Sequence, residues 1–206
     1  MAQPIKKAPW RPRRHRLAGT RSGADRAHPA REGAPARFAG HPWRRLLRGS
    51  GLRLLEIGCG TAEDAGLWLH KGVHEYVGVD LDETAIAQAR SRLPDVTFLC
   101  ADAARLPSVY AGYFDIVLIR RPDLFARPRN WQQVFGVLPA LLRPGGRVLV
   151  VLIGQGETMV ARRWLEGSGL PVTAQAWQPE AEAGHVLVAE KTGTLEMPAR
   201  RCYDQG

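Results

Sequence analysis

The sequence predicts an α/β protein built on a mostly parallel β-sheet. From Leu52 onward, short apolar runs of strand length alternate with stretches in which apolar residues have helical spacing, as expected for a parallel sheet with crossover helices. The run from Arg147 to Ile153 is nearly all apolar, which indicates a strand buried on both faces. The first run ends at Gly58 and Gly60, where the backbone can turn sharply and leave room for a ligand.

The hydrophobic pattern and the end signals place each element. Strands are predicted at 52–57, 75–80, 96–99, 114–119 and 147–153, and 172–177 with 185–190 as a terminal antiparallel hairpin. Helices are predicted at 62–70, 83–93, 130–142 and 157–166. Pro94 ends the second helix, Pro139 is expected to kink the third or end its regular hydrogen bonding, and residues 143–146 form a stop and turn.

Composition divides the chain into three segments. Residues 1–37 are rich in Arg, Pro, Ala and Gly with almost no aliphatic pattern, which predicts a basic, disordered tail. Residues 38–192 form the predicted folded domain, with a short helix at 41–48, and 193–206 form a loose C-terminal tail. A length of 206 residues fits one domain with such tails.

Positive charge is concentrated at the start of the chain. Residues 1–50 hold 13 Lys and Arg against 2 acidic residues, a net of +11, while the whole chain carries +9, so residues 51–206 carry −2. A uniformly basic fold would have pointed to nucleic acid. Contact with RNA is therefore expected only through the N-terminal arm.

The sequence gives no sign of a membrane or metal protein. No apolar run is long enough to span a bilayer, and the basic N-terminus lacks the apolar core of a secretory signal. The three cysteines, at positions 59, 100 and 202, are scattered and form no metal-binding pattern. A cytoplasmic protein without a metal is expected, and its oligomeric state is left open.

The first turn narrows the choice of ligand. A dinucleotide fingerprint would need a third glycine where Glu63 stands, and a carboxylate there would repel a pyrophosphate. A P-loop is excluded because no Gly-Lys-Ser/Thr follows. What remains is an acidic residue followed by spaced small residues: Glu56, Gly58, Gly60 and Ala62. Such a turn suits a ligand that carries positive groups.

Three acidic residues follow successive predicted strands. Glu56 lies at the end of the first, Asp80 at the end of the second and Asp102 just past the third, and ligands bind at this edge of an open α/β sheet. Asp80 lies about twenty residues beyond the glycine turn, the spacing at which a carboxylate accepts from ribose hydroxyls. Asp102 is placed to accept from an adenine amine, with the Ala103 N–H donating to a ring nitrogen.

Together these motifs resemble the class I S-adenosylmethionine (SAM)-dependent methyltransferases over about residues 52–190. The resemblance is carried by segments 55–61, 79–80, 101–103, 114–117 and 142–146. It implies a three-layer, Rossmann-like, seven-stranded sheet with an antiparallel last strand, and SAM as methyl donor. Ala62 departs from the family, which usually has a third glycine there. The implied cofactor-binding residues are Glu56, Gly58, Cys59, Gly60, Asp80, Leu81, Asp102, Ala103 and Ile119.

The resemblance assigns different residues to the methionine, ribose and adenine parts of SAM. Glu56, or a water it holds, faces the methionine ammonium. Gly58 and Gly60 pass under the methionine and the sugar, Asp80 holds the ribose, and Leu81 packs on the adenine.

The acceptor side is predicted to involve the loop after the fourth strand. Arg120, Arg121 and Asp123 lie where the transferred methyl group should be. In one interpretation an arginine binds an anionic substrate and Asp123 acts as a base; in the other, the loop only packs over the cofactor. The Asn/Asp-Pro-Pro-aromatic motif of amino-methylating relatives is absent, which argues against adenine N6, cytosine N4 or glutamine as acceptor. A small molecule is the expected acceptor, and an exposed group on a larger partner is left open.

Two other functions share this sheet. One alternative is a non-catalytic SAM-binding protein whose basic arm contacts RNA or a protein, and the replacement at Ala62 supports it. An aminopropyl transferase is disfavoured because the loop after Ile119 offers Asp123 beside two competing arginines.

Overall fold

The computed structural model describes residues 51–106, 108–177 and 184–193. The predicted N-terminal arm, the short helix at 41–48 and nearly all of the predicted C-terminal tail lie outside these ranges. The strands are β1 (Leu52–Ile57), β2 (Val73–Asp80), β3 (Thr97–Cys100), β4 (Phe114–Arg120), β5 (Leu142–Leu152), β6 (Val172–Trp177) and β7 (His185–Glu190). The helices are α1 (Ala65–His70), α2 (Glu83–Arg92), α3 (Pro128–Leu141) and α4 (Gln155–Gly167), with short 3₁₀ turns η2 (Ala103–Arg105) and η3 (Ser108–Tyr110).

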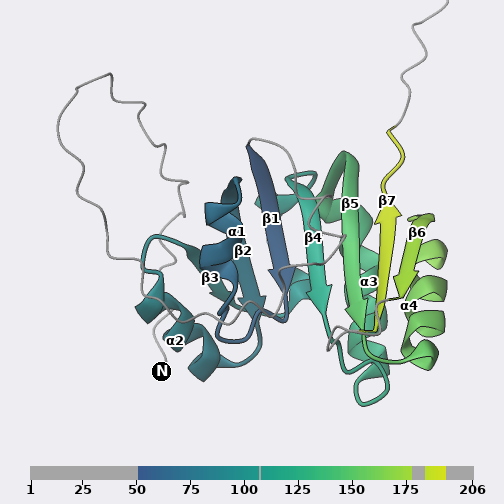
Figure 1. Cartoon of the computed structure of the whole chain (residues 1–206), viewed down its shortest axis with the longest axis horizontal. Helices are drawn as coiled ribbons and strands as arrows, with labels where there is room; N and C mark the ends of the chain where they lie inside the picture. Colours follow the sequence, from purple (N-terminus) through teal and green to yellow (C-terminus); the bar gives the residue numbers. More distant parts are fainter. Residues whose placement is uncertain (1–50, 107, 178–183, 194–206) are drawn as a thin grey trace, which may run out of the picture. The chain divides into compact units, whose positions relative to one another are not determined.

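The strands form one seven-stranded sheet in the order β3-β2-β1-β4-β5-β7-β6 (Figure 1). The five strands from β3 to β5 pair in parallel, whereas β7 runs antiparallel to both β5 and β6. The predicted fold class is confirmed, including the terminal hairpin and the antiparallel last strand. Strand order reverses between β1 and β4, which makes their carboxyl ends the switch point where α/β sheets bind ligands.

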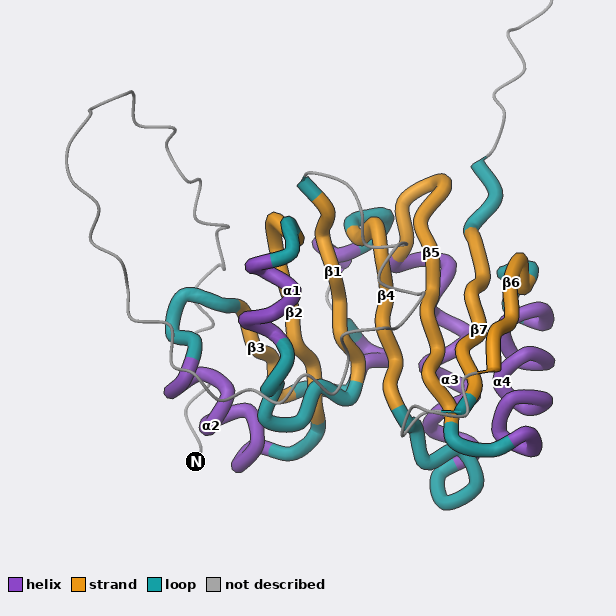
Figure 2. Tube along the Cα trace, viewed as in Figure 1, coloured by secondary structure: helices purple, strands orange, loops and turns teal. Residues whose placement is uncertain are grey.

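Helices lie on both faces of the sheet (Figure 2). Alternate side chains of each strand enter different cores, since successive strand residues point to opposite faces. Leu55 and Ile57 join the core beneath α3 and α4, whereas Leu54 joins the core with α1 and α2. The central strands are therefore buried on both faces, as their apolar sequence predicts.

Most boundaries lie within one or two residues of the prediction, and three differences affect the turns and helices around the site. Helix α1 begins at Ala65 rather than at residue 62, because Ala62 has φ +53 and cannot belong to a right-handed helix. Helix α3 begins at Pro128 and continues past Pro139 to Leu141. Strand β5 begins at Leu142, so residues 143–146 belong to a strand with an irregular register beside β4 rather than to a free turn.

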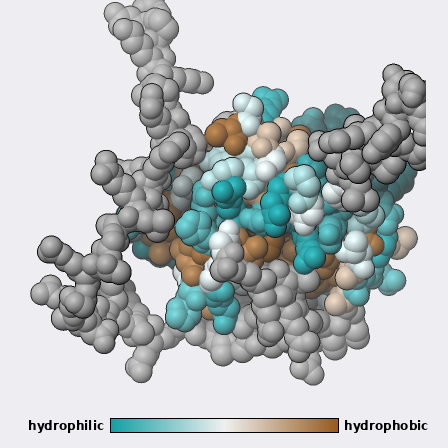
Figure 3. All heavy atoms as spheres, turned by 90° about the horizontal axis from the view of Figure 1, so that it is seen from above, coloured by the Kyte–Doolittle hydropathy of each residue, from teal (hydrophilic) through white to brown (hydrophobic). Residues whose placement is uncertain are grey.

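The carboxyl ends of the parallel strands all lie at one edge of the sheet, the lower edge in Figure 1. Figure 3 looks from above onto the opposite edge, where hydrophilic and hydrophobic residues are interspersed on the visible part of the described surface. The candidate site is built at the carboxyl edge, from the turns and loops that follow β1 to β4.

Candidate active site

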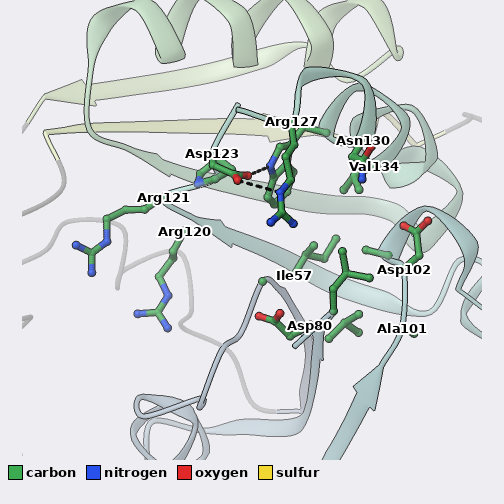
Figure 4. A pocket seen from close by; sticks show the side chains of 16 residues that line it. Ile57, Asp80, Ala101, Asp102, Arg120, Arg121, Asp123, Arg127, Asn130 and Val134 are labelled. Carbon is green, nitrogen blue, oxygen red and sulfur yellow. Dashed lines mark hydrogen bonds and ion pairs between the residues drawn. The ribbon is translucent and has the colours of Figure 1, made fainter. Parts of the chain in front are cut away.

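A cavity of about 240 Å³ lies at the carboxyl ends of β1 to β4 (Figure 4). Strand ends and the turns after them form one wall, and the first turns of α3 form the other. The residues that line it are Ile57, Gly58, Val79, Asp80, Leu81, Ala101, Asp102, Ala103, Arg120, Arg121, Pro122, Asp123, Arg127, Asn130, Trp131 and Val134. Eight of the twelve residues predicted for the site are among these.

The glycine turn is fixed to the end of β2. Gly58 has φ +73, a conformation that a residue with a side chain rarely adopts. Its N–H and that of Cys59 both donate to the Val79 carbonyl, at 2.8 and 3.1 Å. The Gly60 N–H donates to Oδ2 of Asp80 at 2.7 Å. Gly60 is not among the residues that line the cavity, but its N–H orients Asp80, which is.

Asp80 is half-buried and lies on the floor of the cavity (Figure 4). Its second oxygen, Oδ1, accepts from the Asp82 N–H at 3.0 Å. Each carboxylate oxygen accepts two hydrogen bonds, so both retain a lone pair beyond the backbone donors that orient them. The carboxylate is thus held in place to accept further hydroxyl groups.

Asp102 and Ala103 form the far end of the cavity. Oδ1 of Asp102 accepts from the Ala104 N–H at 2.9 Å, which starts the 3₁₀ turn η2. The Asp102 side chain is 41% exposed, so it is accessible to a ligand. Leu81, the residue after Asp80, also lines the cavity and is 54% exposed, an apolar surface of the kind that a flat aromatic group covers.

Glu56 has a different position from the one expected of a ligand contact. It is fully buried, and it lies behind the cavity wall rather than on it. The Tyr76 hydroxyl donates to Oε2 at 2.6 Å, and Nε of Arg120 donates to Oε1 at 2.6 Å. Arg120 also donates through Nη1 to Oδ2 of Asp64 at 2.5 Å. Arg120, itself a cavity residue, is therefore held between two carboxylates.

This cluster has strongly perturbed protonation equilibria. Burial raises the pKa of Glu56, against the opposing effects of Arg120 and Tyr76. Desolvation alone would lower the pKa of Arg120, but the carboxylates of Glu56 and Asp64 outweigh it and raise that pKa overall. Burial and then Glu56 raise the pKa of Tyr76. Arg120 is thus a permanent cation whose charge is already balanced by protein groups.

Cys59 and Ile119 do not line the cavity. Cys59 is 5% exposed, and burial, with Glu56 and Asp80 nearby, raises its pKa to about 12. A thiol of that pKa is not a nucleophile at neutral pH. Ile119 is fully buried in the core beneath α3 and α4.

The loop after β4 is organised around Asp123. Oδ1 of Asp123 accepts from Nε1 of Trp131 at 2.5 Å, and Oδ2 lies 3.5 Å from Nε of Arg127. Arg121, at φ +47, donates its backbone N–H to Val151 at 2.7 Å. Asp123 therefore already accepts from one donor and is ion-paired with a cation, which weakens its candidacy as a general base.

Four lining residues at the start of α3, one just before the helix and three within it, were not predicted for the site. The sequence could not show that they approach the glycine turn, because this depends on how α3 packs on the sheet. The one local signal is a tryptophan on the polar amino half of that helix. The four are Arg127, Asn130, Trp131 and Val134.

The described residues form neither a metal-binding cluster nor a helix able to span a membrane. Among them, no group of three or more His, Cys, Asp or Glu side chains is arranged to bind a metal ion. The helices of this part of the chain are also too short or too polar to cross a membrane.

The topology defines a Rossmann-like domain whose cavity lies at the switch point of the sheet, where such sheets bind ligands. Residues 54–146 match a family model described as a methyltransferase domain. The demethylmenaquinone methyltransferase of Beutenbergia cavernae is 33% identical over 116 residues, which are 52% of this chain and 45% of that protein. The chain thus spans about half the length of this curated relative.

Solved structures share the fold. The [4+2]-cyclase SpnF has a TM-score of 0.60 at 17% identity, covering 73% of this chain and 80% of that one. The 1,6-didemethyltoxoflavin-N1-methyltransferase of Burkholderia thailandensis, with 1,6-didemethyltoxoflavin and S-adenosylhomocysteine bound, has a TM-score of 0.59 at 22% identity, covering 76% and 79%. Residues 54–146 are thus similar to a methyltransferase domain, as the motifs of the chain predict, and the solved structures show that the chain shares the fold.

Proposed function

We propose that this protein transfers a methyl group from SAM to a small-molecule acceptor. The observation that carries the proposal is the placement of Asp80. Its carboxylate is oriented by the Gly60 and Asp82 N–H groups and lies on the floor of a cavity bounded by the glycine turn. The non-catalytic alternative gains no support, because the family match and the curated relative are both methyltransferases.

The residues of the cavity fit the donor from end to end. Asp80 accepts from the ribose hydroxyls, and Asp102 with Ala103 reads the adenine edge while Leu81 covers its face. Gly58, with no side chain, leaves room for the methionine part. Glu56 acts at this end through Arg120, whose guanidinium it orients.

Catalysis in this proposal rests on alignment. When bound, SAM supplies a methyl group already activated by its sulfonium. The protein then has to hold donor and acceptor in line, which contributes much of the rate acceleration. Asp123 is not needed as a base and serves to hold Trp131 and Arg127.

The proposed acceptor is a small anionic molecule. Arg121 is exposed and Arg127 is 61% exposed, and both line the cavity on either side of Asp123 (Figure 4). Guanidinium groups at such a rim attract carboxylate or phosphate groups. The relatives named above include enzymes of demethylmenaquinone and of 1,6-didemethyltoxoflavin, so small molecules are methylated on this fold. We also propose a cytoplasmic location, since Cys59 and Cys100 are both free thiols.

Calorimetric titration of the purified full-length chain with SAM, S-adenosylhomocysteine and NAD tests the donor. We expect micromolar binding of the first two and none of NAD. Asp80→Ala should weaken SAM binding by about 1–3 kcal/mol, because the ribose hydroxyls lose their acceptor. Asp82→Ala is the matched control: it removes a neighbouring carboxylate that caps α2 and does not line the cavity. Equal affinity in the Asp80 variant and wild type would contradict the assignment.

Methyl-labelled SAM tests the acceptor class. After incubation of the enzyme with a cell extract, label should appear in the low-molecular-mass fraction. Label confined to RNA or protein would instead assign a macromolecular acceptor.

A further inference from the structure

One aromatic side chain bridges the two walls of the cavity. Trp131, from α3, is half-buried and is the only aromatic residue among the described residues that line the cavity. A methyl group built on Gly58 would lie 3.9 Å from Cη2 of Trp131. The benzene side of the indole therefore reaches the glycine turn from the opposite wall.

The orientation of this indole is fixed by its polar edge. Nε1 donates to Oδ1 of Asp123 at 2.5 Å. Asp123 is in turn ion-paired with Arg127, at 3.5 Å, and accepts through its backbone carbonyl from the N–H groups of Ala126 and Arg127, both at 3.1 Å. Nε1–H is the one polar group of the indole, and this hydrogen bond satisfies it. The rest of the ring can therefore contact a ligand only through its carbon atoms and its π-surface.

The charges around this end of the cavity make a cationic ligand group favourable. Of the arginines on the lining, Arg127 lies beside Trp131 and is ion-paired with Asp123 at 3.5 Å. The one at the end of β4, Arg120, is ion-paired with Glu56 and Asp64 at 2.5 Å each. Its charge is thus balanced twice over, while Asp80 contributes a further negative charge to the lining. A cation beside the face of an aromatic ring is attracted by the ring quadrupole, most strongly by that of tryptophan.

We propose that Trp131 is a positioning residue that packs against the sulfonium end of SAM, with Asp123 holding the indole in place. This inference rests on the proposed function, which lays the methionine part of SAM across Gly58. The sulfonium carries a positive charge, whereas the corresponding sulfur of S-adenosylhomocysteine is neutral. Trp131 should therefore favour SAM over the product and so assist product release.

The ratio of the dissociation constants for S-adenosylhomocysteine and SAM tests the proposal. Leucine keeps much of the apolar volume of Trp131 but has no π-surface. Trp131→Leu should therefore lower this ratio by roughly five- to thirtyfold, whereas Trp131→Phe should restore most of it. Asp123→Ala should lower the ratio as well, because it releases the indole.

Phe125→Leu is the matched control. Phe125 lies in the same loop, is 65% exposed and does not line the cavity, so its replacement should leave the ratio unchanged. Thermal unfolding of each variant shows whether it has folded. Equal weakening of both ligands in Trp131→Leu would overturn the proposal, since it would mean that the indole serves only as packing. Failure of the wild type to bind either ligand would instead overturn the proposed function.

Discussion

The guanidinium of Arg120 is bound by carboxylates of the protein, although this residue lines the cavity. It lies at the end of β4 and lines the cavity, as expected, yet its guanidinium binds Glu56 and Asp64. Glu56 and Arg120 are 64 positions apart and meet because β1 and β4 are adjacent parallel strands. An acid predicted to face the ligand is instead the buried support of a cavity residue.

Removing Arg120 should reveal the cost of burying Glu56. Arg120→Met leaves a fully buried carboxylate with Tyr76 as its hydrogen-bond donor, and breaking a buried pair in this way costs about 3–5 kcal/mol. The loss should depend on pH. The pKa of Glu56 in the folded state, already above its ordinary 4.5, rises further in this variant, so the native state binds more protons than the unfolded state above about pH 4.5.

Stability of the variant should therefore fall as pH rises through that window, and the deficit relative to wild type should be larger at about pH 8 than at about pH 5. Urea unfolding at both pH values measures this difference. The double variant Glu56→Gln with Arg120→Met should lose the pH dependence. A deficit that is equal at both pH values would show that Glu56 is not the group that titrates.

Gly78 of β2 has no side chain, and this leaves the space that Phe98 and the glycine turn occupy. A Cβ on Gly78 would lie 2.7 Å from Cδ1 of Phe98 and 2.9 Å from Sγ of Cys59. Cys59 lies inside the turn and Phe98 lies on β3. Close packing between β2, β3 and the turn therefore sets the position of the cavity floor.

Gly78→Ala should destabilise the fold by about 1–3 kcal/mol, because it overpacks a buried site. Gly136→Ala is the opposite control. Gly136 lies within α3, is exposed, and has no atom within 4 Å of a built Cβ, so alanine should stabilise the helix by about 0.5–1 kcal/mol. Chemical unfolding curves report both changes. A Gly78 variant as stable as wild type would show that Phe98 and Cys59 relax without loss.

The charge of the whole molecule is divided unevenly along the chain. The net of +11 on residues 1–50 and −2 on the remainder separates a basic arm from a nearly neutral domain. The cavity and both cores described above are formed within residues 51–193. The function of the basic arm can therefore be tested separately from the binding of the methyl donor in the cavity.

Deletion of residues 1–37 should leave the domain folded. The segment is rich in Arg, Pro, Ala and Gly and has few aliphatic residues, so it can bury little apolar surface. We expect the free energy of unfolding to change by no more than about 0.5 kcal/mol, measured by thermal unfolding beside the full chain. A large fall in the melting temperature, or an insoluble product, would place the segment within the fold.

The sheet, the glycine turn and the positions of Asp80 and Asp102 after successive strands could be predicted from the amino-acid sequence. These features are local, because apolar periodicity and glycine placement report backbone conformation and strand ends directly. Two contacts could be found only in the folded protein: Glu56 is buried behind the cavity lining and binds Arg120, and Asp123 holds Trp131 near Gly58. Such contacts join side chains from elements far apart in sequence, and their geometry is set by how α3 and β4 pack beside β1.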